Sequence, residues 1–168
     1  MSMKSTNKII VIWITIVVAL FLSLFRMPIY IESFLPNYLA IILLYWAIVA
    51  PERVSVFTGW ISGIILDFLL GSTLGVHAII YSFMVWVLIS QFESIKYYSL
   101  FQKTIVVGTI NFVGCFLLFW LEHVFGALTV DYDLLWSSIS TFFVWPLLYV
   151  VMNLFCGNPE EENKNNYA

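Results

Sequence analysis

Few side chains in the apolar part of this chain could do chemistry. They are two carboxylates and two imidazoles: Asp67, His77, Glu122 and His123. Such groups can bind zinc, but no pair among them has the local spacing of recognised zinc sites. Ser72 and His77 could act as nucleophile and base, yet the sequence offers no third residue to orient the histidine. We therefore predict no metal site, no cofactor and no enzymatic activity.

The stretch from Thr58 to His77 carries a regular pattern of small residues around one acid. The pattern repeats every four residues, at Gly59, Gly63, Asp67, Gly71 and Gly75. On a helix the first three fall close to one side, because four residues are just over one turn. Small residues let a second helix approach closely. In lipid the hydrophobic effect does not drive helices together, so this close packing stabilises their association instead. We expect this series to pack against a helix or a partner, and Ser72 or Thr73 to cap the helix that follows.

The composition is that of an integral membrane protein. Of the 168 residues, 62% are hydrophobic and only 10% are charged, whereas soluble chains carry about 25% charge. The net charge is −3 and the seven Lys and Arg are scattered, which argues against nucleic-acid binding. Cys115 and Cys156 lie in apolar surroundings without a ligand spacing, so we expect free thiols.

Six apolar segments are predicted to cross the membrane as helices. They cover residues 9–25, 35–50, 54–70, 74–91, 104–125 and 134–155. The third and fourth come from one apolar run, 54–91, which as a single helix would be about 57 Å long against a bilayer core of about 30 Å. It must fold back, and Gly71-Ser72-Thr73 is its turn. The predicted fold class is all-α: a polytopic membrane bundle of six transmembrane helices forming one domain, 1–156, with a polar, disordered cytoplasmic tail, 157–168.

Six of the seven Lys and Arg fall in the two terminal tails and in the second and fourth loops. The positive-inside rule then places both termini in the cytoplasm. With this orientation the embedded polar residues collect in the outer leaflet, at Asn37, His77, Glu122, Ser137 and Ser138. We predict a polar cleft there for a partner helix or a ligand. The alternative is that polar side chains near helix ends reach the headgroups, and we favour it for Glu122 and His123.

Asp67 has two possible roles. It lies on the glycine side of its helix, so it should face protein. If it only accepts hydrogen bonds from the 71–73 turn, Asp67→Asn should be nearly harmless. If its charge engages a partner, Asp67→Asn should leave a folded protein that binds this partner weakly, and this second outcome is our prediction.

Several motifs follow one another along the chain: LPNY at 35–38, PERV at 51–54, LDFLLGSTLG at 66–75 and FWLE at 119–122. Over about residues 9–155, these motifs and the order of spans resemble the MreD family, rod shape-determining membrane proteins of Gram-negative bacteria. The hairpin around Asp67 is the most specific part of this resemblance.

The resemblance implies a non-enzymatic, multi-pass scaffold of the bacterial inner (cytoplasmic) membrane, surrounded by membrane lipid. The family acts with MreC, which has one transmembrane helix and a periplasmic domain. Through MreC it acts with the MreB cytoskeleton, the RodA glycosyltransferase and the transpeptidase of RodA, which build lateral-wall peptidoglycan. The implied fold is similar to the substrate-binding subunits of energy-coupling-factor vitamin transporters. Such a subunit is the alternative function, although the A-x-x-x-A face with which those subunits dock is absent from this sequence.

Overall fold

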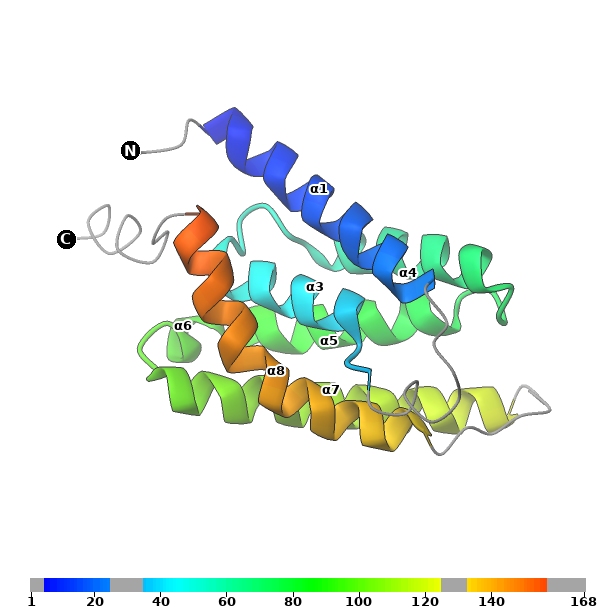
Figure 1. Ribbon diagram of the computed structural model, residues 1–168. Helices are drawn as coiled ribbons and strands as arrows, with labels where there is room; N and C mark the ends of the chain where they lie inside the picture. Colours follow the sequence, from blue (N-terminus) through cyan, green and yellow to red (C-terminus); the bar gives the residue numbers. More distant parts are fainter. Residues whose placement is uncertain (1–4, 25–34, 125–132, 157–168) are drawn as a thin grey trace.

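A computed structural model describes residues 5–24, 35–124 and 133–156 of the chain. Within these ranges every regular element is a helix (Figure 1), which confirms the all-α class. The predicted tail, 157–168, lies outside the described residues. The helices are α1 (Ser5–Leu24), α3 (Tyr38–Val49), α4 (Val56–Leu70), α5 (Val76–Ser90), α6 (Phe92–Ile95), α7 (Leu100–Val124) and α8 (Asp133–Cys156).

The six long helices of this described part coincide with the six predicted segments. Two stretches are long and apolar enough to cross a membrane by themselves, Leu100–Leu121 and Trp136–Leu154. The other four apolar stretches are shorter: Ile9–Leu24, Tyr38–Val49, Val56–Leu70 and Val76–Ser90. Passage of all six through the bilayer therefore stays a prediction.

One predicted boundary is wrong. The fifth segment was predicted to begin at residue 104, but residues 92–103 contain α6, and α7 already begins at Leu100. The reason is a reciprocal cap: the Ser99 N–H donates to Gln102 Oε1 at 2.9 Å, and the Gln102 N–H donates to Ser99 Oγ at 3.4 Å. This Ser-x-x-Gln pattern is a capping box that starts a helix. Lys103 consequently sits in the first turn of α7, with its Nζ 5.6 Å from the centre of the Tyr149 ring.

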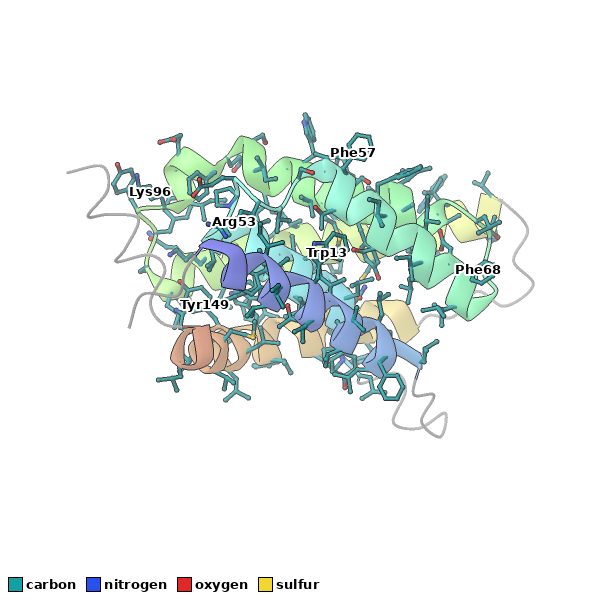
Figure 2. The ribbon with its side chains drawn as sticks, turned by 90° about the horizontal axis from the view of Figure 1, so that it is seen from above. Trp13, Arg53, Phe57, Phe68, Lys96 and Tyr149 are labelled. Atoms are coloured by element: carbon teal, nitrogen blue, oxygen red, sulfur yellow. The ribbon has the colours of Figure 1, made fainter. Side chains whose placement is uncertain are left out.

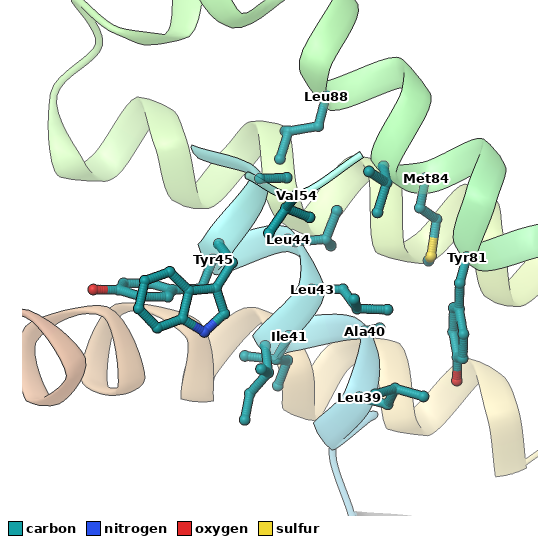
Figure 3. Close-up of a cluster of buried hydrophobic side chains, with 14 of the residues drawn as sticks. Leu39, Ala40, Ile41, Leu43, Leu44, Tyr45, Val54, Tyr81, Met84 and Leu88 are labelled. Atoms are coloured by element: carbon teal, nitrogen blue, oxygen red, sulfur yellow. The ribbon is translucent and has the colours of Figure 1, made fainter. Parts of the chain in front are cut away.

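The central element is α3. Eleven of its twelve residues are buried, because its sequence is apolar on every side and has no face suited to water. It packs against α1, α5 and α8, while α4 pairs with α5 and α7 pairs with α8. Figure 3 shows the side chains of Leu43 and Leu44 in the same cluster as Met84 and Leu88 of α5. The short helix α3 thus lies at the centre of the bundle and connects the α4–α5 pair with the α7–α8 pair.

The described basic side chains lie toward one end of the bundle. Arg53 and Lys96 lie toward one end and Phe68 toward the other (Figure 2). Lys103 lies at the same end as Lys96, because it comes directly after α6 and the 96–99 turn. This separation is what the predicted orientation requires, with the basic end in the cytoplasm.

We expect reporters fused at Glu93 and at Asp131 to report opposite sides of the membrane. The reason is that α7, the longest apolar helix, separates these two positions. A cytoplasmic reporter such as green fluorescent protein and a periplasmic one such as alkaline phosphatase, each fused at both sites, would measure this. A fusion at the N-terminus serves as the control and should match Glu93. Equal sidedness at Glu93 and Asp131 would contradict the six-span arrangement.

Candidate functional site in the α4–α5 hairpin

The first two glycines of the four-residue series bring α4 against the backbone of α5. A Cβ on Gly59 would lie 2.9 Å from the carbonyl oxygen of Tyr81. A Cβ on Gly63 would lie 2.5 Å from the Ala78 nitrogen and still closer to the Ala78 Cα. Real Cβ atoms do not approach backbone atoms this closely, so these positions admit only glycine at the present helix separation. The predicted packing face thus lies between α4 and α5.

The last two glycines of the series serve the turn instead. Gly71 ends α4 with φ +64°, and Gly75 precedes α5 with φ +96°. Both values lie in the left-handed region that side chains disfavour. No neighbouring atom lies within 4 Å of a Cβ built at either site. Their glycine identity therefore comes from backbone conformation and not from helix contact.

We expect Gly63→Ala to destabilise the protein by about 1–3 kcal/mol, the usual cost of overpacking. The new methyl would meet the rigid backbone at Ala78. Gly114→Ala is the matched control, since there the methyl would meet the flexible end of the Met84 side chain, which can turn away. Thermal unfolding in detergent would measure both variants. An unchanged midpoint for Gly63→Ala would contradict the close approach of α4 and α5.

Asp67 closes the hairpin with four hydrogen bonds. Its carboxylate is completely buried. Oδ2 accepts from the Gly75 N–H at 2.7 Å, and Oδ1 accepts from the Ser72 hydroxyl at 3.0 Å. Oδ1 also accepts from the His77 backbone N–H at 3.3 Å and lies 2.6 Å from His77 Nδ1. A carboxylate in an apolar bundle needs such compensation, and every partner comes from the ten residues that follow it.

The predicted cap by Ser72 or Thr73 is not observed. The N-cap of α5 is Gly75, which has no side chain to offer, and the Ser72 hydroxyl bonds back to Asp67. Two of the N–H groups at the start of α5, those of Gly75 and His77, donate to Asp67 from the preceding helix. Both Asp67 oxygens are occupied inside the hairpin, so this geometry favours the turn-holding role of Asp67 over direct contact with a partner.

A second polar cluster joins four helices around Asn37. Asn37 Oδ1 accepts from the Ala40 N–H at 3.2 Å, capping α3, and from the Tyr81 hydroxyl at 3.0 Å. The Asn37 N–H donates to Thr141 Oγ1 at 3.2 Å. Cys115 hydrogen-bonds with Asn37 and with Ser138. These contacts tie the start of α3 to α5, α7 and α8.

The structure therefore brings together three of the five residues predicted to line a polar cleft. Asn37 and Ser138 share one cluster, and His77 joins it through its ring, whose centre lies 5.8 Å from that of Tyr81. Ser137 is partly buried, and its carbonyl accepts from the Thr141 hydroxyl at 2.9 Å. The side chain of Glu122 is outside the described part.

Sequence reasoning missed Tyr81 and Thr141 as members of the polar cluster. Tyr81 lies four residues after His77, and Thr141 lies three after Ser138, so each shares a helix face with a predicted residue. His123, by contrast, is exposed near the end of α7. Among the described side chains no three His, Cys, Asp or Glu residues gather as a metal site would require.

Comparisons with known proteins place the whole bundle in one family. A model of the family described as rod shape-determining protein MreD matches residues 3–156. The chain belongs to the MreD family. It is 27% identical over 150 residues to the rod shape-determining protein MreD of Haemophilus influenzae, a match that covers 87% of this chain and 93% of the relative.

Membership confirms the resemblance that rested on the motifs between residues 35 and 122. The chain is accordingly a rod shape-determining membrane protein of the MreD family. No solved structure matches the chain. The expected likeness to energy-coupling-factor subunits thus remains a prediction.

The four bonds at Asp67 change the sequence-based expectation that Asp67→Asn is nearly harmless if the acid only holds the turn. We now expect this variant to lower stability by about 1–3 kcal/mol, the cost of an unpaired buried polar group. An asparagine keeps one acceptor oxygen, but its NH₂ would face a donor, either the Gly75 N–H or the group at Oδ1. Ser72→Ala removes one donor and leaves Asp67 three bonds, so a smaller loss is expected. The two variants should be compared by abundance in the membrane and by thermal unfolding in detergent. A fully stable Asp67→Asn protein would refute the turn-holding role.

Proposed function

We propose that the chain is a non-enzymatic membrane scaffold of the rod complex, which binds MreC and so supports lateral peptidoglycan synthesis. The observation that carries this proposal is the match to the MreD family over residues 3–156. Through MreC, the chain would act with MreB, RodA and the transpeptidase of RodA. Both termini would lie in the cytoplasm.

The arrangement of polar groups supports a binding role. The hydrogen bonds of the Asp67 and Asn37 clusters hold α3, α4, α5, α7 and α8 together. The outer surface is largely apolar, with exposed side chains such as Phe57, Phe68 and Phe143. A rigid bundle with such a surface is suited to packing against another transmembrane helix, where close fit and a few polar contacts supply the affinity.

The alternative, a substrate-binding subunit for a vitamin-type transporter, needs a chamber. Between α3 and α5 the described residues leave a narrow crevice, lined by Ala40, Leu43, Leu44, Tyr81, Met84 and Val85, without room for a water molecule. Small-molecule sites measure about 300–1,000 Å³. This crevice is too narrow for a vitamin and lends the alternative no support, so the scaffold is the preferred function.

The scaffold predicts a stable complex with MreC. We expect the affinity-tagged chain, produced in its native membrane, to co-purify with MreC, and its depletion to turn rods into spheres. The MreC fraction in the eluate and the ratio of cell length to width would be measured together. A tagged unrelated six-span protein of similar abundance is the control. Absence of MreC from the eluate, with the chain intact and cells rounded on depletion, would refute the MreC-binding scaffold.

A further inference from the structure

Three buried polar side-chain atoms inside the described bundle have no hydrogen-bond partner. They are Oδ1 and Nδ2 of Asn111 and Nε1 of Trp145. Both residues are completely buried. Removing an amide or an indole N–H from water without a new partner is strongly unfavourable, and native proteins satisfy nearly all such groups with protein atoms or with ordered water. These three atoms therefore indicate a place where a polar ligand is needed.

The two residues reach one level between α7 and α8. Two contacts give the register of this antiparallel pair: Gly108 with the Phe142 ring, and Cys115 with Ser138. Asn111 comes one turn after Gly108, and Trp145 comes one turn after Phe142. Because side chains on a helix lean toward its N-terminus, each of the two leans back toward the level of the Gly108–Phe142 contact. Their polar ends thus approach the same level from opposite helices.

The backbone carbonyl of Phe142 adds an acceptor at this level. Pro146 lies four residues later inside α8. A proline has no N–H, so it cannot donate the usual helical hydrogen bond to this carbonyl. In bundles that lie in lipid, backbone groups freed in this way are satisfied by neighbouring side chains or by ordered water. Two acceptors, the Phe142 carbonyl and Asn111 Oδ1, and the Trp145 indole donor therefore belong to one level.

The surroundings determine the chemical class of the ligand. Asn111 lies near the middle of α7 and is fully enclosed, so a lipid headgroup cannot reach it. The polar side chains described around it, such as Thr141 and Cys115, are neutral, whereas a buried ion would need a countercharge. The ligand must be small and uncharged, and it must both donate and accept hydrogen bonds. Water has these properties, and a buried water typically forms about three hydrogen bonds.

Polar side chains lead from the surface of the bundle to this level. Asn37 is partly exposed at the start of α3, and its N–H donates to Thr141 Oγ1 at 3.2 Å. Thr141 directly precedes Phe142, so it lies beside the unpartnered atoms. The Phe142 ring, which covers Gly108, belongs to a residue that is 37% exposed. This ring can turn toward the lipid and make room for a water, which occupies about 30 Å³ in the liquid.

We propose that Asn111 and Trp145 hold an internal water molecule between α7 and α8. The water accepts from the Trp145 indole N–H and donates to Asn111 Oδ1 and to the Phe142 carbonyl. Asn111 Nδ2 is then left to donate toward Thr141. The water links α7 with α8, as Asp67 links α4 with α5, and this role does not depend on any partner of the scaffold.

The test is the transfer of NMR magnetisation from water to isotope-labelled side chains of the full chain in lipid bilayers. We expect cross peaks with water at the Trp145 indole N–H and at the Asn111 amide. Trp46 is the matched control, because it is also buried but its indole N–H donates to Thr15 Oγ1 at 2.8 Å. Its indole should show no such cross peak. Trp145→Phe and Asn111→Leu assign the two signals by their loss.

Asn111→Leu also tests whether the two residues share one water. The variant replaces the amide with an apolar group of similar size, so we expect the water cross peak of Trp145 to disappear. If this variant does not accumulate, a high-resolution structure of the wild type decides. Water density within hydrogen-bond distance of both Trp145 Nε1 and Asn111 Oδ1 would support the site, and its absence would refute it.

Three results would overturn the inference. The first is the absence of a water cross peak at either Asn111 or Trp145 in the wild type. The second is an equal cross peak at Trp46, because water would then enter the bundle without regard to unpartnered groups. The third is a Trp145 cross peak that persists in folded Asn111→Leu protein, because the amide would then not hold the water.

Discussion

A single buried carboxylate determines how the α4–α5 hairpin is built. Asp67 cannot remain in an apolar bundle without partners, because an unsolvated charge is costly there. The chain supplies those partners locally, from Ser72, Gly75 and His77. To bring donors from three residues around one side chain, the backbone turns sharply at Gly71 and again at Gly75. The left-handed glycines, the short turn and the orientation of His77 are therefore consequences of one electrostatic requirement.

The close packing of the two helices follows from the same turn. A tight hairpin brings α4 and α5 together over their full length, which only small residues at the contact allow. Gly59 and Gly63 provide that space against Tyr81 and Ala78. The second cluster extends this rigidity: the Asn37 side chain caps α3 and receives the Tyr81 hydroxyl, so the central helix is tied to the hairpin. The bundle is fixed by polar contacts at helix starts and by apolar contacts along α3.

The sequence predicted the parts of this structure that depend on local patterns. The apolar segments, the fold-back at 71–73 and the packing role of Gly59 and Gly63 follow from length and periodicity, which nearby residues determine. The start of α7 was missed although Ser99 and Gln102 formed a readable capping box. The Tyr81–Asn37 bond joins residues 44 positions apart. No local pattern specifies such a pair, because it depends on how α3 meets α5. Asp67 accepts hydrogen bonds from the turn and also caps α5. This combination could not be predicted from local patterns either, because it depends on the three-dimensional path of the turn.

The hydrogen bonds inside the bundle limit which polar atoms could help such a protein to distinguish one partner helix from another. Most polar side chains inside the described bundle bond to backbone groups or to one another, so they hold the fold. The outer surface is mainly apolar, and apolar surface alone discriminates poorly between one transmembrane helix and another in lipid. Specificity then depends on shape and on the few polar atoms that remain open, since a mismatched helix leaves such an atom unpaired. The rigidity that Asp67 gives the hairpin is thus a condition for folding and, in the proposed scaffold, for recognition as well.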